Sequence, residues 1–241
     1  MRKLAPGEVR VHWADTEHPS IRARIDEFRS WMTPEERARE ERFRFEHLRL
    51  DFVLTRALVR ATLSQYAKVP PATWRFETGS HGRPHIASPI ADLCFNLSDT
   101  AGRVVCAVSL EPEIGIDIES TTSRVEIVGV AESSFAPREV AALRTLPASE
   151  QIGRFFAYWT LKESYIKARG LGLAIPLDSF WFDIAGETAS ISFDARTPDD
   201  PSRWHFVRER LSDRHVVAVA VAPRAAGVPT IGFERESDLL P

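Results

Sequence analysis

The sequence predicts an α+β protein made of two similar α/β-type halves, each a small, mostly antiparallel sheet packed on helices. The first observation is that the order strand, helices, strands occurs twice along the chain. The second is that the apolar segments Arg103–Ser109 and His215–Ala222, which close the two runs, are alike. The third is a break near Glu119–Arg124. We therefore expect a pseudo-twofold arrangement of an N-terminal half, residues 1–120, and a C-terminal half, residues 121–241, with a short C-terminal tail.

The composition is that of an ordinary globular protein. Of the 241 residues, 44% are hydrophobic and 27% are charged, which permits a proper core. The formal net charge of −3 offers no basic surface for nucleic acid. The sequence holds neither an apolar run of membrane-spanning length nor a signal-peptide core in its first twenty residues. We expect a cytoplasmic monomer that binds neither nucleic acid nor membrane, with Cys94 and Cys106 as free thiols.

The N-terminal half begins with an alternating strand at Glu8–Asp15, and a helical pattern follows it. A further helix starts at Thr33, because Thr33 and Glu36 form a capping box and Pro34 occupies the first helical position. The pattern continues to Tyr66, as two helices or as one bent helix.

Arginine is concentrated in this helical region. The arginines of this region are Arg37, Arg39, Arg42, Arg44, Arg49, Arg56 and Arg60. Carboxylates are interleaved with them, so one interpretation is an ion-paired face in contact with solvent. The other interpretation is that two or three of these arginines bind an anion.

The remaining elements follow from apolar alternation and turn residues. Strands are expected at Trp74–Glu77, Leu93–Leu97, Arg103–Ser109, Ile114–Glu119, Ser179–Asp183, Ala189–Phe193, Trp204–Glu209 and His215–Ala222. Helices are expected at Val125–Ser133, Pro137–Leu146 and Glu150–Arg169. Beyond Pro223 we expect a loosely attached tail.

The strand Ile114–Glu119 carries the most unusual pattern. Alternation sends its isoleucines to one face and Gly115, Asp117 and Glu119 to the other. The two carboxylates are about 6.6 Å apart at Cα, from a rise of about 3.3 Å per residue. They can share one Mg2+, which prefers oxygen ligands and keeps waters for a phosphate partner. The alternative is the solvated face of an edge strand.

The helix Glu150–Arg169 contributes a third carboxylate. Spacings of three and four residues place Phe156, Trp159, Glu163 and Lys167 on one stripe. If the halves pack together, Glu163 joins the two strand carboxylates, and three carboxylates with a lysine suit phosphoryl-group chemistry. The alternative is a surface pair of Glu163 and Lys167, worth ~0.2–0.5 kcal/mol.

These residues together resemble the 4′-phosphopantetheinyl transferases of the two-half, surfactin-synthetase-activating type. Two motifs carry the resemblance, Ile-Gly-Ile-Asp-Ile-Glu at Ile114–Glu119 and Trp-Thr-Leu-Lys-Glu-Ser-Tyr-Ile-Lys at Trp159–Lys167. Two shorter ones support it in the expected order, Gly82–Pro84 and Phe95–Ser98. The resemblance covers nearly the whole chain.

The resemblance implies a fold, an activity and roles for individual residues. Such enzymes transfer the phosphopantetheine arm of coenzyme A to a serine of an apo acyl or peptidyl carrier protein in fatty acid, polyketide or nonribosomal peptide synthesis. By this resemblance Asp117, Glu119 and Glu163 gather Mg2+ on the coenzyme A pyrophosphate. Asp117 and Glu163 are catalytic, and either Glu163 or a water ordered by the metal helps to remove the serine proton. Lys167 binds coenzyme A and stabilises the departing adenosine 3′,5′-bisphosphate.

The resemblance also implies contacts to coenzyme A. Arg83, beside Pro84 in the Gly-Arg-Pro loop, is expected at the adenosine phosphates, and Ser98 at the pyrophosphate or the 3′-phosphate. The helix arginines that add phosphate contacts are Arg37, Arg39 and Arg56.

One position departs from the family pattern. Asp99 follows Ser98 where the family usually has histidine, and a carboxylate cannot donate to a phosphate. Either Arg103 supplies that contact or coenzyme A binds more weakly. Two alternative functions therefore stay open: a coenzyme A- or carrier-binding module without catalysis, and another Mg2+-dependent phosphotransferase or phosphodiesterase.

Overall fold

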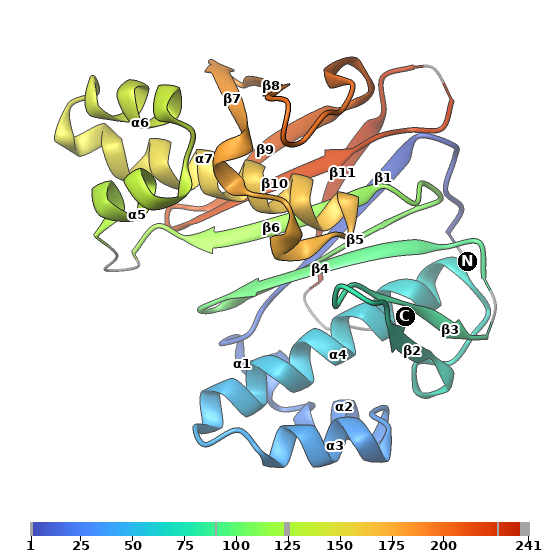
Figure 1. The fold of residues 1–241 in the computed structure, drawn as a ribbon. Helices are drawn as coiled ribbons and strands as arrows, with labels where there is room; N and C mark the ends of the chain where they lie inside the picture. The colour runs from blue at the N-terminus through green and yellow to red at the C-terminus, as the bar shows by residue number, and fades with distance from the viewer. Residues whose placement is uncertain (1, 90, 123–125, 226, 237–241) are drawn as a thin grey trace.

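The computed structural model describes residues 2–89, 91–122, 126–225 and 227–236 (Figure 1). Its strands are β1 (Glu8–Asp15), β2 (Arg75–Thr78), β3 (Pro84–Ser88), β4 (Cys94–Thr100), β5 (Arg103–Ser109), β6 (Ile114–Ser120), β7 (Phe180–Ala185), β8 (Thr188–Phe193), β9 (His205–Ser212), β10 (His215–Val221) and β11 (Thr230–Arg235). Its α-helices are α1 (Pro19–Arg22), α2 (Ile25–Ser30), α3 (Pro34–Glu41), α4 (Glu46–Tyr66), α5 (Ile127–Ser134), α6 (Pro137–Arg144) and α7 (Ala148–Arg169). Short 3-10 turns are η1 (Pro71–Thr73), η2 (Gly172–Ala174), η3 (Leu177–Ser179) and η4 (Pro201–Arg203).

The same strand order occurs in two sheets. One sheet contains β1, β5 and β4 as antiparallel neighbours, and the other contains β6, β10 and β9 in the same way. A long helix and a hairpin come after the first strand of each set, α4 with β2–β3 and α7 with β7–β8. The predicted α+β class, with small antiparallel sheets packed on helices, is confirmed.

The division of the chain into halves stays a prediction. The boundary expected between residues 120 and 121 leaves β6 in the first half, whereas β6 pairs with β10 and therefore favours a boundary before Ile114. Residues 123–125, where the expected break ends and a helix was expected to start, lie outside the described ranges.

The expectation of a loosely attached tail beyond Pro223 is wrong for residues 230–236, which the structure describes as docked. Residues Thr230–Arg235 form β11, which pairs in parallel with β1, and the Glu236 amide donates to the Trp13 carbonyl at 2.8 Å. Ile231 and Phe233 pack against a core shared by both sheets. Burial of these two apolar side chains explains why the segment docks.

The two sheets meet along β4 and β6 through side chains. Asn96 Oδ1, Ser98 Oγ and Thr100 Oγ1, at alternate positions of β4, accept the amide hydrogens of alternate residues of β6. The donor–acceptor distances are 3.0, 3.3 and 3.3 Å. We call this row the β4–β6 seam. It aligns a strand of each sheet without a backbone ladder between them.

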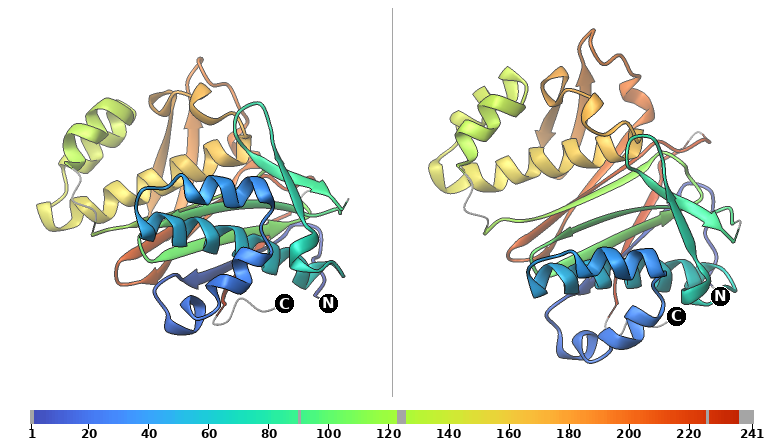
Figure 2. Two further views of the ribbon diagram at one scale, coloured as in Figure 1. Left: turned by 90° about the horizontal axis from the view of Figure 1, so that it is seen from below. Right: turned by 60° about the horizontal axis from the view of Figure 1, so that its bottom comes forward.

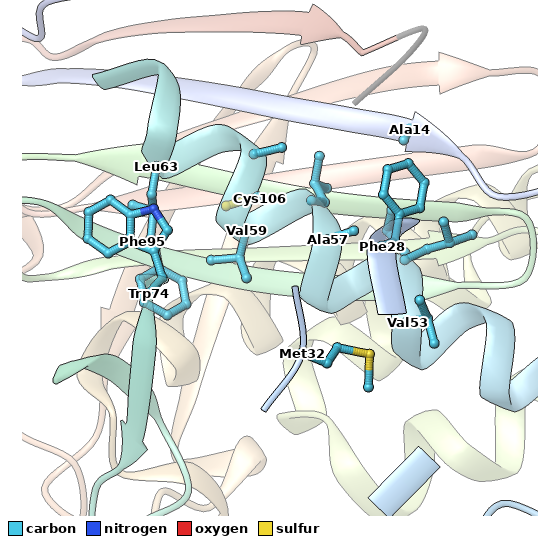
Figure 3. Packing of buried hydrophobic residues seen from close by; sticks show 14 of the residues in the cluster. Ala14, Phe28, Met32, Val53, Ala57, Val59, Leu63, Trp74, Phe95 and Cys106 are labelled. Carbon is cyan, nitrogen blue, oxygen red and sulfur yellow. The ribbon is translucent and has the colours of Figure 1, made fainter. Parts of the chain in front are cut away.

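Three cores hold the layers together. The α4 core, part of which is shown in Figure 3, contains Phe28, Trp74 and Cys106. A second core surrounds α7, and a third joins the inner faces of the sheets. Figures 1 and 2 show α7 on one side of the strands and α4 on the other.

Local predictions from the N-terminal half are confirmed. Thr33 caps α3 through a capping box with Glu36, and the region to Tyr66 is two helices, α3 and α4. Cys94 and Cys106 are free. Among the residues that the structure describes, no helix has the length and apolar character needed to cross a membrane.

Candidate functional site

Helix α7 packs closely against β6 because Gly115 has no side chain. A Cβ atom there would lie 2.0 Å from the carbonyl oxygen of Ser164 and 2.4 Å from the amide nitrogen of Ala168. Any larger residue would push the helix away, because both contacts are to backbone atoms. The close approach brings Lys167 of α7 to Asp117 of β6, so the predicted face of β6 does point toward α7.

Asp117, Ser98 and Lys167 form a closed triangle of hydrogen bonds at the seam. The Lys167 ammonium donates to Asp117 Oδ1 at 2.7 Å and to Ser98 Oγ at 2.9 Å, and the Ser98 hydroxyl donates to the same Asp117 oxygen at 2.9 Å. The other oxygen, Asp117 Oδ2, is buried without a hydrogen-bond partner. Burial raises the pKa of Asp117, although Lys167 and Ser98 act against this rise.

Two further carboxylates flank this triangle. Burial and the charge of Asp117 raise the pKa of Glu119 to about 7, while Lys167 and a hydrogen bond from Trp159 oppose the shift. Burial and the Asp117 charge also raise the pKa of Glu163, which is half-buried on α7. Negative charge is therefore in excess here despite Lys167. A divalent cation would relieve that excess, and oxygen ligands suit Mg2+.

The three carboxylates are more widely spaced than the ligand atoms of a compact metal site. Within the described ranges, one group of His, Cys, Asp or Glu residues has its ligand atoms all within 4.8 Å of one another, and it is His12, Glu234 and Glu236. His12 already bonds Glu236 at 2.6 Å and the Tyr66 hydroxyl at 2.8 Å. Because its ring nitrogens are both engaged, we assign no metal to that group.

A cavity of about 260 Å³ opens beside these side chains. Its lining includes Arg83 and Pro84 from the loop and start of β3, Asn96 from β4, and Glu163 and Lys167 from α7. The structure thus brings residues expected at coenzyme A and residues expected to be catalytic around one cavity.

Arg83 is held by backbone carbonyls. Its guanidinium donates to the oxygens of Ala168 and Pro112 at 2.8 Å each and to that of Ile114 at 3.0 Å. Burial lowers the pKa of Arg83, but a guanidinium stays charged in proteins. The side chain ties the loop before β3 to α7 and to the start of β6, and so places a fixed positive charge at the cavity.

The helix arginines are not among the residues that line the cavity. The Cζ atoms of Arg56 and Arg39 lie 5.1 and 5.4 Å from the centre of the Phe52 ring. Arg37 donates to the Met32 carbonyl oxygen at 2.8 Å. Arg56 Nε is buried without a partner, so among these three arginines Arg56 offers the clearest free donor for an anion.

Asp99 lies exposed on β4, within electrostatic reach of Lys167 and Arg56. Its carboxylate would compete with an incoming phosphate for these two cations. Arg103, expected as a possible replacement for the missing histidine, is paired with Asp15 at 2.9 Å.

Sequence reasoning missed the part played by Asn96 and Thr100. Asn96 both lines the cavity and accepts from β6, and Thr100 ends the row of acceptors. The available signal was a polar side chain at every second position of a strand otherwise rich in apolar residues. This alternation of polar side chains does not predict that β4 lies beside β6.

Comparisons with known proteins agree on one family. The sequence model of the 4′-phosphopantetheinyl transferase superfamily matches residues 113–220. The chain is 32% identical to the 4′-phosphopantetheinyl transferase HetI of Nostoc sp., over 83% of this chain and 82% of HetI. It is 31% identical to the phosphopantetheinyl transferase of Thraustochytrium sp., over 92% and 81% of the two chains. It is 32% identical to the 4′-phosphopantetheinyl transferase Sfp of Bacillus subtilis, over 71% and 75%.

Proposed function

The chain belongs to the 4′-phosphopantetheinyl transferase superfamily, and on this basis we propose that it carries out a Mg2+-dependent transfer at the β4–β6 seam. The transferred group is the phosphopantetheine arm of coenzyme A, and the acceptor is a serine of an apo acyl or peptidyl carrier protein. The observation that carries the proposed location is the contact of Asp117 with Lys167 beside the cavity lined by Glu163.

The oxygen donors present suit a magnesium ion in their chemistry, although the three carboxylates lie farther apart than the ligand atoms of a compact metal site. Asp117 Oδ2 is a buried oxygen without a partner, and Glu119 and Glu163 have raised pKa values next to it. These three carboxylates would hold Mg2+, which when bound neutralises charge on the pyrophosphate oxygens.

Glu163 is suited to accept the proton of the attacking serine, and Lys167 is suited to stabilise the charge on the leaving group. As the serine oxygen bonds to the phosphorus that carries the pantetheine arm, the serine proton passes to the Glu163 carboxylate, whose raised pKa makes it a better acceptor. The bond from that phosphorus to the adenosine bisphosphate breaks, and the Lys167 ammonium stabilises the developing charge. Lys167 has three N–H donors, of which Ser98 and Asp117 use two.

Binding of coenzyme A would use charges that the protein already holds in place. Arg83, with Pro84 beside it, faces the cavity and would contact the adenosine phosphates. Arg56 and Arg39, on the α4 side, are proposed as additional phosphate contacts. A monomeric state and a cytoplasmic location stay predictions.

The test is to incubate the protein with coenzyme A, Mg2+ and a panel of apo carrier proteins, and to weigh the carriers by mass spectrometry. We expect a gain of one phosphopantetheine group on the carrier. Coenzyme A binding by calorimetry with every carrier unmodified would instead indicate a binding module. Turnover of coenzyme A without a carrier would indicate another phosphotransferase.

A further inference from the structure

Lys162 is a buried charge in the motif Trp159–Lys167 that the proposed reaction does not use. Its side chain is fully buried, and its ammonium uses all three of its N–H donors within the protein. The acceptors are the Leu177 carbonyl at 2.7 Å, the Phe180 carbonyl at 2.6 Å and Glu139 Oε2 at 2.8 Å. No donor is left for a ligand, so any effect of Lys162 on the cavity must be indirect.

Glu139, the partner of Lys162 on α6, is also bonded within the protein. Its Oε1 accepts the Phe182 amide of β7 at 2.9 Å, and its Oε2 accepts the Ala136 amide at the start of α6 at 3.0 Å. Both side chains of the ion pair are 0% exposed. Because removal of one partner would leave a buried charge uncompensated, the pair holds α6, α7 and the start of β7 in one arrangement.

The bonds of Lys162 hold both ends of the segment that forms one wall of the cavity. We call residues 163–176 the α7 wall. It begins directly after Lys162 and ends directly before Leu177, whose carbonyl accepts a bond from Lys162. Among the described residues, those that line the cavity from α7 onward all lie in this wall, and they are Glu163, Ile166, Lys167, Gly170 and Gly172.

We propose that Lys162, held by Glu139, is a positioning residue, which fixes the α7 wall in the arrangement that accepts coenzyme A. This inference rests on the proposed function, because coenzyme A is the ligand proposed for the cavity. Lys162 is not among the residues that line the cavity and acts through the wall. If the unheld wall took up the binding arrangement about one-tenth of the time, the affinity for coenzyme A would fall about tenfold.

Thr160 provides a matched control on the same helix. It is 1% exposed, and its hydroxyl donates to the Phe156 carbonyl of α7 itself at 2.8 Å. Thr160→Val therefore removes a buried hydrogen bond from α7 without releasing the α7 wall. Glu139→Gln is the milder variant of the ion pair, because it removes one charge and leaves Lys162 bonded to its two carbonyls.

The experiment measures coenzyme A binding by calorimetry for wild type, Lys162→Met, Glu139→Gln and Thr160→Val, after circular dichroism has shown which of them are folded. Misfolded molecules lower the stoichiometry of binding, whereas a displaced wall lowers the affinity. We expect Lys162→Met to bind about tenfold more weakly and Glu139→Gln about threefold more weakly, both at wild-type stoichiometry. Thr160→Val should stay within about twofold of the wild-type affinity.

Two results would overturn the inference. The first is a wild-type affinity in folded Lys162→Met, and the second is an equal loss of affinity in Thr160→Val. If Lys162→Met does not fold, Glu139→Gln decides the question, and an affinity equal to that of Thr160→Val would then overturn it.

The wild-type protein separates this inference from the proposed function. Wild type that binds coenzyme A but modifies no carrier contradicts the proposed transfer, and the comparison of affinities still decides the role of Lys162. Wild type that does not bind coenzyme A contradicts both.

Discussion

Ionisation of Glu119, which lies at the seam, should make the free energy of unfolding depend on pH. Its pKa rises from the ordinary value of 4.5 to about 7 on folding, because burial and the Asp117 charge disfavour the ionised form. Between these two values the folded state binds more protons than the unfolded state. The contribution of Glu119 to stability therefore falls as the pH rises from about 4.5 to about 7, and changes little above that.

The measurement is chemical unfolding of wild type and Glu119→Gln from pH 4.5 to 8.5 with a chelator present. Because glutamine does not titrate, the variant should gain stability relative to wild type as the pH rises through this window. Mg2+ should reduce the difference at pH 8, where it would neutralise the carboxylates. Two stability curves that stay parallel at every pH would contradict the raised pKa of Glu119.

Among the elements, the contact of α7 with β6 decides whether the charged residues meet. Gly115→Ala should lower the free energy of unfolding by about 3 kcal/mol, since the new methyl group meets backbone atoms of the helix. It should also reduce transfer activity, because Lys167 would move away from Asp117. Chemical unfolding and a carrier modification assay check the two effects.

Gly153→Ala is the control for this substitution. Gly153 lies in α7, and a Cβ atom there meets nothing within 4 Å. Alanine should therefore leave activity unchanged and stabilise the helix by up to ~1 kcal/mol. Equal stability of Gly115→Ala and wild type would show that α7 does not need the close approach.

Local patterns predicted which charged residues of the candidate site face one another, but not the hydrogen bonds that connect them. Alternation along β6 and helical spacing in α7 predicted the faces that bring Asp117 to Lys167 and place Glu163 and Lys167 at one cavity, because both depend on local backbone geometry. The bond from Ser98 to Asp117 joins strands of two different sheets. Its formation depends on tertiary pairing, which side-chain spacing does not reveal.

At the scale of the whole molecule, β11 joins the end of the chain to its beginning. In the order β11-β1-β5-β4 it occupies the edge opposite the strand that contributes to the cavity. Phe233→Ala should therefore destabilise the protein by ~2 kcal/mol through lost apolar burial, without changing the KM for coenzyme A. Thermal unfolding and steady-state kinetics test this.

Val228→Ala serves as the comparison, because Val228 precedes β11 and is 86% exposed. It should change stability by less than ~0.5 kcal/mol. If Phe233→Ala is equally neutral, β11 is not docked as described. A raised KM would mean that the distant edge of the sheet influences the cavity.

The sequence predicted the two sheets of the molecule, but it did not predict that the C-terminal strand β11 joins the sheet of β1. Two similar runs of elements predicted two similar sheets, since each run has its own apolar surface to bury. The segment at Ile231 and Phe233 is short and follows Pro229, and its partner β1 lies more than two hundred residues away. Neither composition nor period could assign it to the sheet of β1.

The most direct test of the account is carrier modification by wild type and Glu163→Gln, measured side by side by mass spectrometry with coenzyme A and Mg2+. Glutamine has the same shape as glutamate but neither accepts the serine proton nor offers a charged ligand. We predict that wild type adds one phosphopantetheine group to the carrier, and that folded Glu163→Gln is at least ~100-fold slower. Equal rates for the two proteins would contradict the proposed site.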